Sequence, residues 1–423
     1  MELLNLGYEK YILNNGLEVI LYQNKNIPLV AVNLWYKVGS AQEKKGKTGI
    51  AHLFEHMMFQ GSQNVAKEMH FKLIQEAGGS LNGSTSFDRT NYFEKVPSNF
   101  LELTLWLESD RMGFLLPALD QEKLDNQKKV VYNERLERYD NQPYGLAWEL
   151  LINNLYNESH PYSWSTIGFA EDIKSYTLND VSAFFKKYYS PGNASIVVAG
   201  NFDTHRTKSL VQKYFGDIVN NNGLNNFNPV KPEFKESKTI LHKDNVQLER
   251  IYLSWLTQKA FEKDDAALDI LSDLLAGSKN SRLYKSLVFE NEIAQDVSAF
   301  QFSGKYGGHF TIVATAKPGN SLDQIKSEIF NKISYLTKNG IAPLELQRSK
   351  NGIKSNFAFS LQNLDTIADH LNLYNYYLNE PNSFAFDLNR YESVGQEEIT
   401  NVASHYLSDT FIELRIIPKN NIS

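Results

Sequence analysis

The spacing of apolar residues switches between strand-like and helix-like periods along the start of the chain. Residues 17–22 are rich in β-branched and aromatic side chains and follow residues 11–13 across an Asn-Asn-Gly turn, which predicts an antiparallel hairpin. Residues 30–38 alternate as a further strand. Residues 49–60 and 66–77 place apolar side chains at helical spacing, and a glycine follows each run. This part is therefore predicted to hold three strands and two helices.

Two longer stretches complete the first half. Residues 80–96 read as strand, with Asn, Gly, Ser and Thr near its start. Residues 100–155 carry long helical patterns that break at 141–143, where the sequence is Asn-Gln-Pro. We expect a sheet combined with several helices.

The second half of the chain repeats features of the first. Four residues recur at an offset of 218: Asp180, Val181, Tyr188 and Ser190 correspond to Glu398, Ile399, Tyr406 and Ser408. A second match, offset by 216, pairs residues 51–62 with residues 267–278. Two diverged copies of one α+β unit explain both offsets. We predict two homologous domains, each a mostly antiparallel sheet packed with helices.

A polar stretch separates the two copies. Residues 220–233 are dominated by Asn, Gly and Pro, which favour irregular backbone and cannot bury an apolar face. The length of 423 residues also exceeds the roughly 250 to 300 that one hydrophobic core supports. We predict an N-terminal domain over 1–222, a linker over 223–235 and a C-terminal domain over 236–423.

Composition and charge exclude several classes of protein. The 43 basic and 49 acidic residues give a net charge of -6, so no positive field is available for a nucleic-acid backbone. The absence of cysteine excludes disulfides and thiolate metal sites. No apolar run reaches the roughly 18 residues that cross a bilayer, and the amino terminus lacks the pattern of a signal peptide. We expect no nucleic-acid or membrane partner, and a cytoplasmic location, or a periplasmic one if a leader is removed ahead of residue 1.

The helix predicted over 49–60 carries residues suited to metal chemistry. His52 and His56 lie four residues apart on one helix face, and Glu55 lies beside them. Two imidazoles on neighbouring turns can bind one Zn²⁺, and the carboxylate can take a proton from metal-bound water. This His-x-x-Glu-His spacing is the inverted zinc-peptidase signature. The matching positions of the second copy hold Leu268, Leu271 and Ser272. We therefore place any active site in the first half.

A third zinc ligand is expected from a distant helix. Catalytic zinc sites with two histidines normally add a carboxylate. The helical stretch 127–145 offers Glu134 and, three residues later, Glu137. The residue pattern alone leaves both open.

Four blocks of sequence carry a resemblance to a known family. They are AHLFEHMMFQGS at 51–62, GGSLNGSTSFDRTNYFEKVP at 78–97, NERLERYDNQPYG at 133–145 and HPYSWSTIGFAEDI at 160–173. In order and spacing they resemble the pitrilysin/insulinase family of zinc metallopeptidases, in its subfamily of short two-domain subunits similar to those of mitochondrial processing peptidase. The resemblance covers essentially the whole chain. It implies a zinc-dependent endopeptidase with one zinc per chain.

The resemblance implies a role for each residue of the motifs. Glu134 matches the family's third ligand, with 77 residues between it and His56, and Glu137 becomes the second choice. An acid that family members often carry seven residues before this ligand is replaced here by Gln127. Glu55 is expected to act as general base toward a zinc-bound water that attacks the peptide carbonyl.

The resemblance also implies how peptides bind. Family members add the substrate as an extra strand to an exposed sheet edge, which recognises extended backbone irrespective of side chains. The matching residues are Asn82, Gly83, Ser84 and Thr85. We expect short or unfolded polypeptides as substrates.

One pair of family residues is missing. Many family enzymes supply an arginine and a tyrosine from the second homologous unit to bind the substrate carbonyl or the developing oxyanion. At these positions this chain has Val288 and Gln295. A zinc site without the pair is similar to one half of a heterodimer, whose paralogous partner subunit carries it. The alternative is a homodimer in which Arg282 or Tyr284 substitutes.

Two further hypotheses compete with the peptidase. A structural or assembly subunit that has lost its metal is disfavoured by the intact zinc-site residues. A module that holds peptides without cutting them ranks last.

The loop around His160 and Tyr162 is expected to shape the surface near the first domain's helices rather than to act in catalysis.

Overall fold

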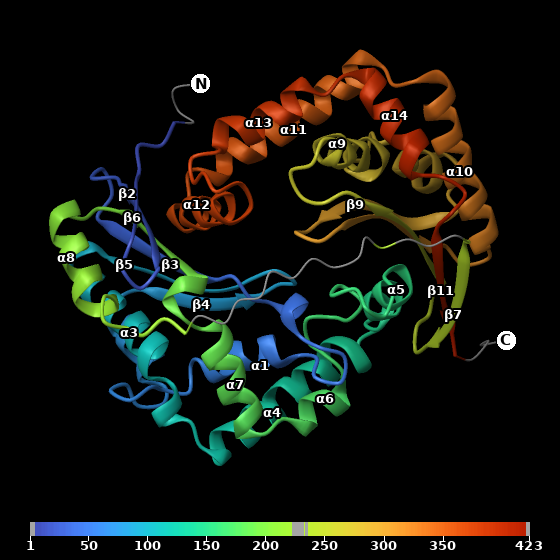
Figure 1. The fold of residues 1–423 in the computed structure, drawn as a ribbon. Helices are drawn as coiled ribbons and strands as arrows, with labels where there is room; N and C mark the ends of the chain where they lie inside the picture. The colour runs from blue at the N-terminus through green and yellow to red at the C-terminus, as the bar shows by residue number, and fades with distance from the viewer. Residues whose placement is uncertain (1–4, 222–231, 233–235, 420–423) are drawn as a thin grey trace. The chain divides into compact units, whose positions relative to one another are not determined.

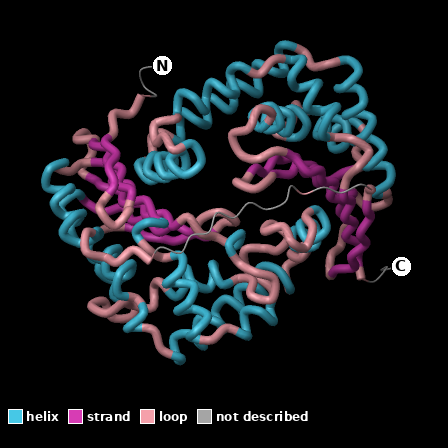
Figure 2. The backbone as a smooth tube through the Cα atoms, viewed as in Figure 1, coloured by secondary structure: helices cyan, strands magenta, loops and turns pink. Residues whose placement is uncertain are grey.

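The computed structural model describes residues 5–221, 232 and 236–419, which form two sheets with helices packed against them (Figure 1, Figure 2). The first sheet has the order β1-β2-β6-β3-β5-β4 and the second β7-β11-β8-β10-β9. The strands of the first are β1 (Glu9–Ile12), β2 (Glu18–Gln23), β3 (Leu29–Tyr36), β4 (Ser80–Thr85), β5 (Thr90–Pro97) and β6 (Ala194–Gly200). Those of the second are β7 (Lys238–Asp244), β8 (Arg250–Thr257), β9 (Ala294–Ser303), β10 (Gly308–Ala316) and β11 (Ile412–Pro418).

The two sheets share one topology. Without β1, the order β2-β6-β3-β5-β4 matches β7-β11-β8-β10-β9 strand for strand. Neighbours are antiparallel in both sheets, except for one parallel pair in each, β2 with β6 and β7 with β11. The predicted α+β class, built from two homologous and mostly antiparallel units, is confirmed.

The helices follow the repeat as well. Those of the first half are α1 (Ile50–Met57), α2 (Met69–Glu76), α3 (Leu101–Phe114), α4 (Gln121–Arg135), α5 (Ala147–Leu155), α6 (Ala170–Ser175), α7 (Leu178–Tyr188) and α8 (Thr204–Phe215). Those of the second half are α9 (Asp265–Ala276), α10 (Leu322–Asn339), α11 (Pro343–Ser360), α12 (Leu364–Leu378), α13 (Phe384–Ser393) and α14 (Gln396–Tyr406). The predicted repeats coincide with α1 and α9 and with α7 and α14. Among the described residues, no helix is both long and apolar enough to span a bilayer.

The chain divides into two compact units that are not contiguous halves. Unit 1 comprises Met1–Arg135, Trp164–Phe227 and Ala358–Ala385, and unit 2 comprises Leu136–Ser163, Asn228–Phe357 and Phe386–Ser423. The predicted division into 1–222 and 236–423 therefore differs from the compact units, because each half of the chain gives one helical segment to the other unit. Helix α5 packs on β8 and β11, whereas α12 packs on β3 and β6. The predicted linker 223–235 lies outside the described residues, apart from Pro232.

The segment predicted as one strand over 80–96 is a hairpin, and this part of the prediction was wrong. The backbone N–H of Ser86 donates to the carbonyl of Arg89 at 2.8 Å, which closes a tight turn between β4 and β5. The hydroxyl of Ser86 also accepts from the N–H of Asp88 and of Arg89, a local bond that competes with continued strand. As a result, β4 forms the edge of the first sheet.

The core of unit 2 explains why the second copy lacks the chemistry of α1. Leu268 and Leu271 of α9 occupy the positions of His52 and Glu55, and both are fully buried in the core beneath the second sheet. Burying a leucine side chain is worth about 1.5 to 3 kcal/mol. The second copy therefore uses this helix face for packing.

Candidate metal centre

Helix α1 turns its metal-binding side chains away from its apolar face. Four apolar residues of the helix are fully buried: Ala51, Leu53, Phe54 and Met57. The side chains of His52 and His56 keep 14% and 24% of their surface exposed. The four-residue spacing thus places both imidazoles on the accessible side of the helix.

The start of α1 is fixed by a buried carboxylate. Glu43 accepts hydrogen bonds from the backbone N–H groups of Gly49, at 2.9 Å, and Ala51, at 2.8 Å. The indole N–H of Trp164 donates to the same carboxylate at 3.1 Å. Gly49 has φ 82°, and a Cβ there would lie 2.4 Å from the carbonyl oxygen of Ile167, so only glycine fits. These contacts hold the helix in place.

Glu134, at the end of α4, completes a cluster with the two histidines. Its Oε2 lies 3.8 Å from Nε2 of His52 and 3.4 Å from Nε2 of His56. The imidazole centroids are 4.9 Å apart, with the rings at 79°. One ligand atom of each residue lies within 4.8 Å of the other two. The structure therefore brings together the three residues that the sequence proposed as ligands.

The geometry of this cluster fits zinc. Bonds of about 2.0 to 2.1 Å in a tetrahedral site put the ligand atoms about 3.3 to 3.4 Å apart. The two measured separations from Glu134, 3.4 and 3.8 Å, are close to this value. The donor set of two imidazole nitrogens and one carboxylate is the His₂Glu type that leaves a fourth position open.

The two candidate glutamates take different positions. After Arg135 the α-helix changes into a π-helical turn, Leu136–Asp140, in which the backbone hydrogen bonds span five residues instead of four. Glu137 lies in this turn, is exposed and is absent from the cluster. Gln127, two turns before Glu134, is buried at 6% exposure.

Glu55 lies beside the cluster with a specific partner. Its Oε2 accepts a hydrogen bond from the hydroxyl of Thr85, at 2.5 Å. Burial raises the pKa of Glu55, and the nearby charge of Glu134 acts in the same direction, whereas Thr85 and His56 oppose the rise. A carboxyl with a raised pKa is a better proton acceptor near neutral pH.

The residues proposed to bind peptide all lie on the edge strand β4. Because Ser86 and Arg89 form a hydrogen-bonded pair, alternation directs the backbone groups of Asn82 and Ser84 toward β5 and those of Gly83 and Thr85 toward the free edge. The N–H of Gly83 donates to Oδ1 of Asn82 at 2.9 Å.

Gly83 is also where the edge strand approaches α1. A Cβ at this position would lie 3.2 Å from Cγ of Glu55 and 3.3 Å from the ring of Phe59. The glycine therefore lets the strand edge pass close to Glu55, and a larger residue would push the two apart.

A second acidic group with a histidine lies buried in unit 1 and does not suit a metal. It contains His70, Glu94 and Glu108, and Arg111 donates to Glu108 at 2.9 Å and to Glu94 at 3.3 Å. Burial alone would raise the pKa of Glu108, but the guanidinium lowers it, while burial holds the pKa of Glu94 well above its usual range. The charges of the Glu108 carboxylate and the Arg111 guanidinium cancel, so the group has no net negative charge to attract a cation. Arg111 would in addition repel a cation.

His160 and Tyr162 shape a loop, but this loop belongs to unit 2 rather than to the helices of unit 1. Nδ1 of His160 accepts from the N–H of Tyr162 at 3.1 Å, and the ring stacks on Tyr156 with centroids 4.6 Å apart. The hydroxyl of Tyr162 accepts from the N–H of Tyr306 at 3.1 Å.

The buried His309 predicts acid sensitivity. Burial lowers its pKa to about 3, against about 6.5 when unfolded. Between these values the unfolded chain binds the extra proton, so stability falls as the pH falls. We expect the difference in unfolding free energy between wild type and His309→Phe to decrease by about 1.4 kcal/mol for each pH unit from about 6 to 4. Urea titrations at several pH values measure this, and parallel curves would contradict it.

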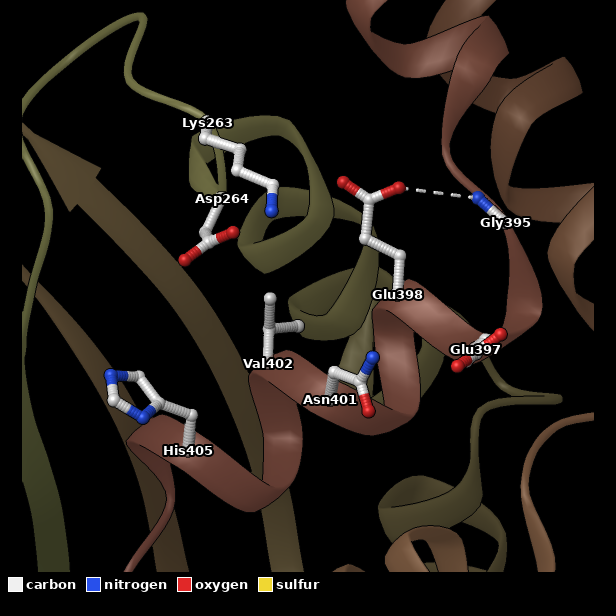
Figure 3. Close-up of a pocket in the computed structure, with 8 residues that line it drawn as sticks. All are labelled: Lys263, Asp264, Gly395, Glu397, Glu398, Asn401, Val402 and His405. Carbon is white, nitrogen blue, oxygen red and sulfur yellow. Dashed lines mark hydrogen bonds between the residues drawn. The ribbon is translucent and has the colours of Figure 1, made fainter.

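One pocket of about 630 Å³ in unit 2 contains none of the proposed site residues (Figure 3). It lies between the start of α9 and α14, and two of its three acids, Glu398 and Asp264, already have structural partners. Glu398 accepts from the N–H of Gly395 at 3.4 Å. Asp264 accepts from Gln258 at 2.9 Å and from the hydroxyl of Tyr406 at 3.0 Å. The pocket therefore adds no candidate chemistry.

Val288 and Gln295 stand at the two positions where many family enzymes carry an arginine and a tyrosine. Val288 is half-buried in a π-helical segment, Tyr284–Glu290, and Gln295 is exposed on β9. Arg282, which was considered as a substitute, donates to both carboxylate oxygens of Glu345, at 3.1 and 2.8 Å. Nε and Nη2 of Arg282 are therefore already engaged by this carboxylate.

Comparisons with known proteins agree over nearly the whole chain. Residues 18–165 match the family described as "Insulinase (Peptidase family M16)", and residues 175–353 match the "Peptidase M16 inactive domain". The zinc protease PqqE of Helicobacter pylori is 32% identical over 412 residues, covering 95% of this chain and 91% of that protein. A probable mitochondrial-processing peptidase subunit beta of Arabidopsis thaliana is 24% identical over 423 residues, covering 96% and 77%.

A solved structure shows the same fold. The crystal structure of a protease from Helicobacter pylori matches with a TM-score of 0.89 at 30% identity, covering 98% of this chain and 100% of that one. Relatives named as zinc proteases support a peptidase-type function. On the strength of the two matched domains and of a relative at 32% identity, the chain belongs to the insulinase family, peptidase family M16.

Proposed function

We propose that this chain is the metal-binding subunit of a zinc-dependent endopeptidase that cuts short or unfolded polypeptides. The observation that carries the proposal is that ligand atoms of His52, His56 and Glu134 lie within 4.8 Å of one another. Glu55 lies beside them, on the helix that carries both histidines. A relative of this chain that is named a zinc protease also supports the proposal.

The proposed mechanism divides the work among few side chains. A zinc ion held by His52, His56 and Glu134 would supply a Lewis acid and would make a water molecule more acidic. Glu55 removes a proton from this water and later returns it to the leaving amine. Thr85 orients the Glu55 carboxylate through the bond to Oε2.

The free edge of β4 would hold the substrate as an additional strand. Gly83 and Thr85 direct their backbone N–H and C=O groups outward, so an extended peptide can pair with both. The N–H of Gly83 already donates to Asn82, and this side chain would give way to a substrate carbonyl. Main-chain pairing suits an enzyme that accepts many sequences.

We further propose that the active enzyme is a heterodimer with a paralogous subunit that supplies an arginine and a tyrosine. Val288 and Gln295 lack the charge and the phenol, and the contact of Arg282 with Glu345 argues against the homodimer in which Arg282 substitutes. Loss of one donor to a developing oxyanion costs about 10²- to 10³-fold in kcat in comparable sites.

The purified chain alone is therefore expected to cleave a quenched-fluorescent peptide set at least about 100-fold more slowly than the complex isolated from the native cell. Both samples should contain one zinc per chain of this subunit, which serves as the control for an intact site. Robust turnover by the chain alone, without any partner, would refute the heterodimer and favour the homodimer.

A further inference from the structure

The turn between β4 and β5 is held by a helix from the second half of the chain. In unit 1, α12 lies against β3 and β6 (Figure 1). The hydroxyl of Tyr377 donates to the carboxylate of Asp88 at 2.9 Å, and that of Tyr376 donates to the Asp88 carbonyl at 3.1 Å. Both bonds reach the tip of the hairpin that carries the proposed peptide-binding edge.

Asp369 of α12 collects three donors from the sheet beneath it. Its Oδ1 accepts from Nδ2 of Asn33 at 3.2 Å, from Nε1 of Trp35 at 3.0 Å and from Nδ2 of Asn91 at 3.1 Å. These three sheet residues are at most 2% exposed, so the carboxylate satisfies polar groups that would otherwise be buried unpaired. A single charged acceptor thereby ties β3 and β5 to α12.

The contacts continue from Asn91 to the edge strand. Oδ1 of Asn91 accepts from the hydroxyl of Ser84 at 2.7 Å and from Nη1 of Arg89 at 3.2 Å. Arg89 also donates to the carbonyl of Ser84 at 2.9 Å and to its hydroxyl at 2.6 Å. The guanidinium lies over the ring of Trp35, 5.1 Å from its centroid. Arg89 is thus fixed from two sides and fixes Ser84 in turn.

Ser84 is followed directly by Thr85, whose hydroxyl binds Glu55. The chain of contacts from α12 therefore ends at the proposed general base. On this basis we propose that Asp369, on a helix of the second half, and Arg89, in the hairpin turn, are positioning residues, which set the edge of β4 and the orientation of Glu55. This inference rests on the proposed peptidase function for its consequence in catalysis, but not for its consequence in the structure of β4.

The negative charge of Asp369 strengthens its three hydrogen bonds to the sheet. Hydrogen bonds to an ionised acceptor are about twice as strong as those between neutral groups. Asparagine at this position keeps the size of the side chain and one oxygen but loses the charge, so it weakens all three bonds and the attraction to Arg89. Loss of a residue that orients a functional group typically costs about 10- to 100-fold in activity.

Asp369→Asn is the test variant, and Asp365→Asn is its matched control. Asp365 lies one turn earlier on α12 and pairs with Lys95 of β5, so its substitution removes a contact between the same helix and sheet without touching the network. Arg89→Lys is the second variant, because lysine keeps the charge but lacks the planar guanidinium that lies over Trp35 while Nη1 binds the carbonyl and the hydroxyl of Ser84.

Three measurements on the zinc-loaded complex decide the proposal. We expect Asp369→Asn and Arg89→Lys to lower kcat/KM about 10- to 100-fold, with one zinc retained per chain. Hydrogen exchange at the amides of Asn82 and Ser84, which face β5, should become at least about 10-fold faster in both, and Asp365→Asn should stay within about twofold of wild type in both kcat/KM and exchange.

Two outcomes separate this proposal from the proposed function. If Asp369→Asn matches Asp365→Asn in both kcat/KM and amide exchange, Asp369 has a purely structural role and the proposal is overturned. If wild type carries zinc but shows no turnover, the peptidase fails. The exchange at Asn82 and Ser84 then still supports or refutes the positioning of β4.

Discussion

Replacement of Glu55 by glutamine is expected to lower kcat by about 10²- to 10⁴-fold while zinc stays bound. The amide keeps the size of the side chain and one acceptor for the hydroxyl of Thr85. It cannot take a proton from water, so the step that generates the nucleophile is lost. Because Glu55 is absent from the cluster of ligand atoms, the substitution leaves the metal-binding groups unchanged.

Turnover of a quenched peptide and zinc content are to be measured on the same preparation of the Glu55→Gln subunit with its partner. A variant that binds zinc and still cleaves at the wild-type rate would remove Glu55 from the role of base. A variant that loses zinc would indicate that Glu55 contributes to metal binding, which the measured geometry does not predict. Thr85→Val, which removes only the bond to Oε2, should give a smaller loss.

Replacement of Glu134 by glutamine is expected to weaken zinc binding by more than about 100-fold, the upper range for residues that only support a ligand. Glu134 is the single acid in the cluster, and its Oε2 is shared between the two histidines at 3.4 and 3.8 Å. The neutral amide removes the negative charge that offsets the charge of the metal. Activity should fall with the zinc content and recover in part when zinc is added in excess.

Glu137→Gln provides the matched control, since it makes the same change three residues later on an exposed π-helical turn. Competition with a zinc chelator gives the affinity of both variants. Equal zinc affinity in Glu134→Gln and wild type would place the third ligand elsewhere, and a loss confined to Glu137→Gln would exchange the two assignments.

The local part of the site could be predicted from residue spacing. A helix with period 3.6 puts positions four apart on one face, so His52 and His56 had to project together once the segment was helical. The place of Glu134 is a different matter, because 77 residues separate it from His56 and no local pattern distinguishes it from Glu137. Family resemblance proposed it, and the structure brings it to the histidines; its role as ligand stays a prediction.

The long-range part of the fold could not be predicted. The apolar stripe of α12 shows that one face is buried, but it does not say which sheet covers it. The helix packs on the sheet of the first half, where Asp369 meets three donors that lie more than 270 residues away in sequence. The same exchange moves α5 to the second sheet. In each case the partner is chosen by tertiary packing, which propensity and periodicity do not encode.

The hairpin of β4 and β5 shows a similar limit on a smaller scale. Its turn residues, Ser86 to Arg89, include a serine and an aspartate but no glycine, asparagine or proline, so the turn signal in the sequence is weak. The side chain of Ser86 closes the turn instead. The four residues of β4 were proposed as a group, and only the hydrogen-bond alternation separates Gly83 and Thr85, at the free edge, from Asn82 and Ser84.

Location of the metal tests the central claim most directly. Crystals of the zinc-loaded protein measured on both sides of the zinc absorption edge should show one anomalous peak per chain, about 2.0 to 2.1 Å from Nε2 of His52, Nε2 of His56 and a carboxylate oxygen of Glu134. A peak at another cluster, or none among these three residues in the presence of excess zinc, would contradict the assignment of a catalytic metal centre.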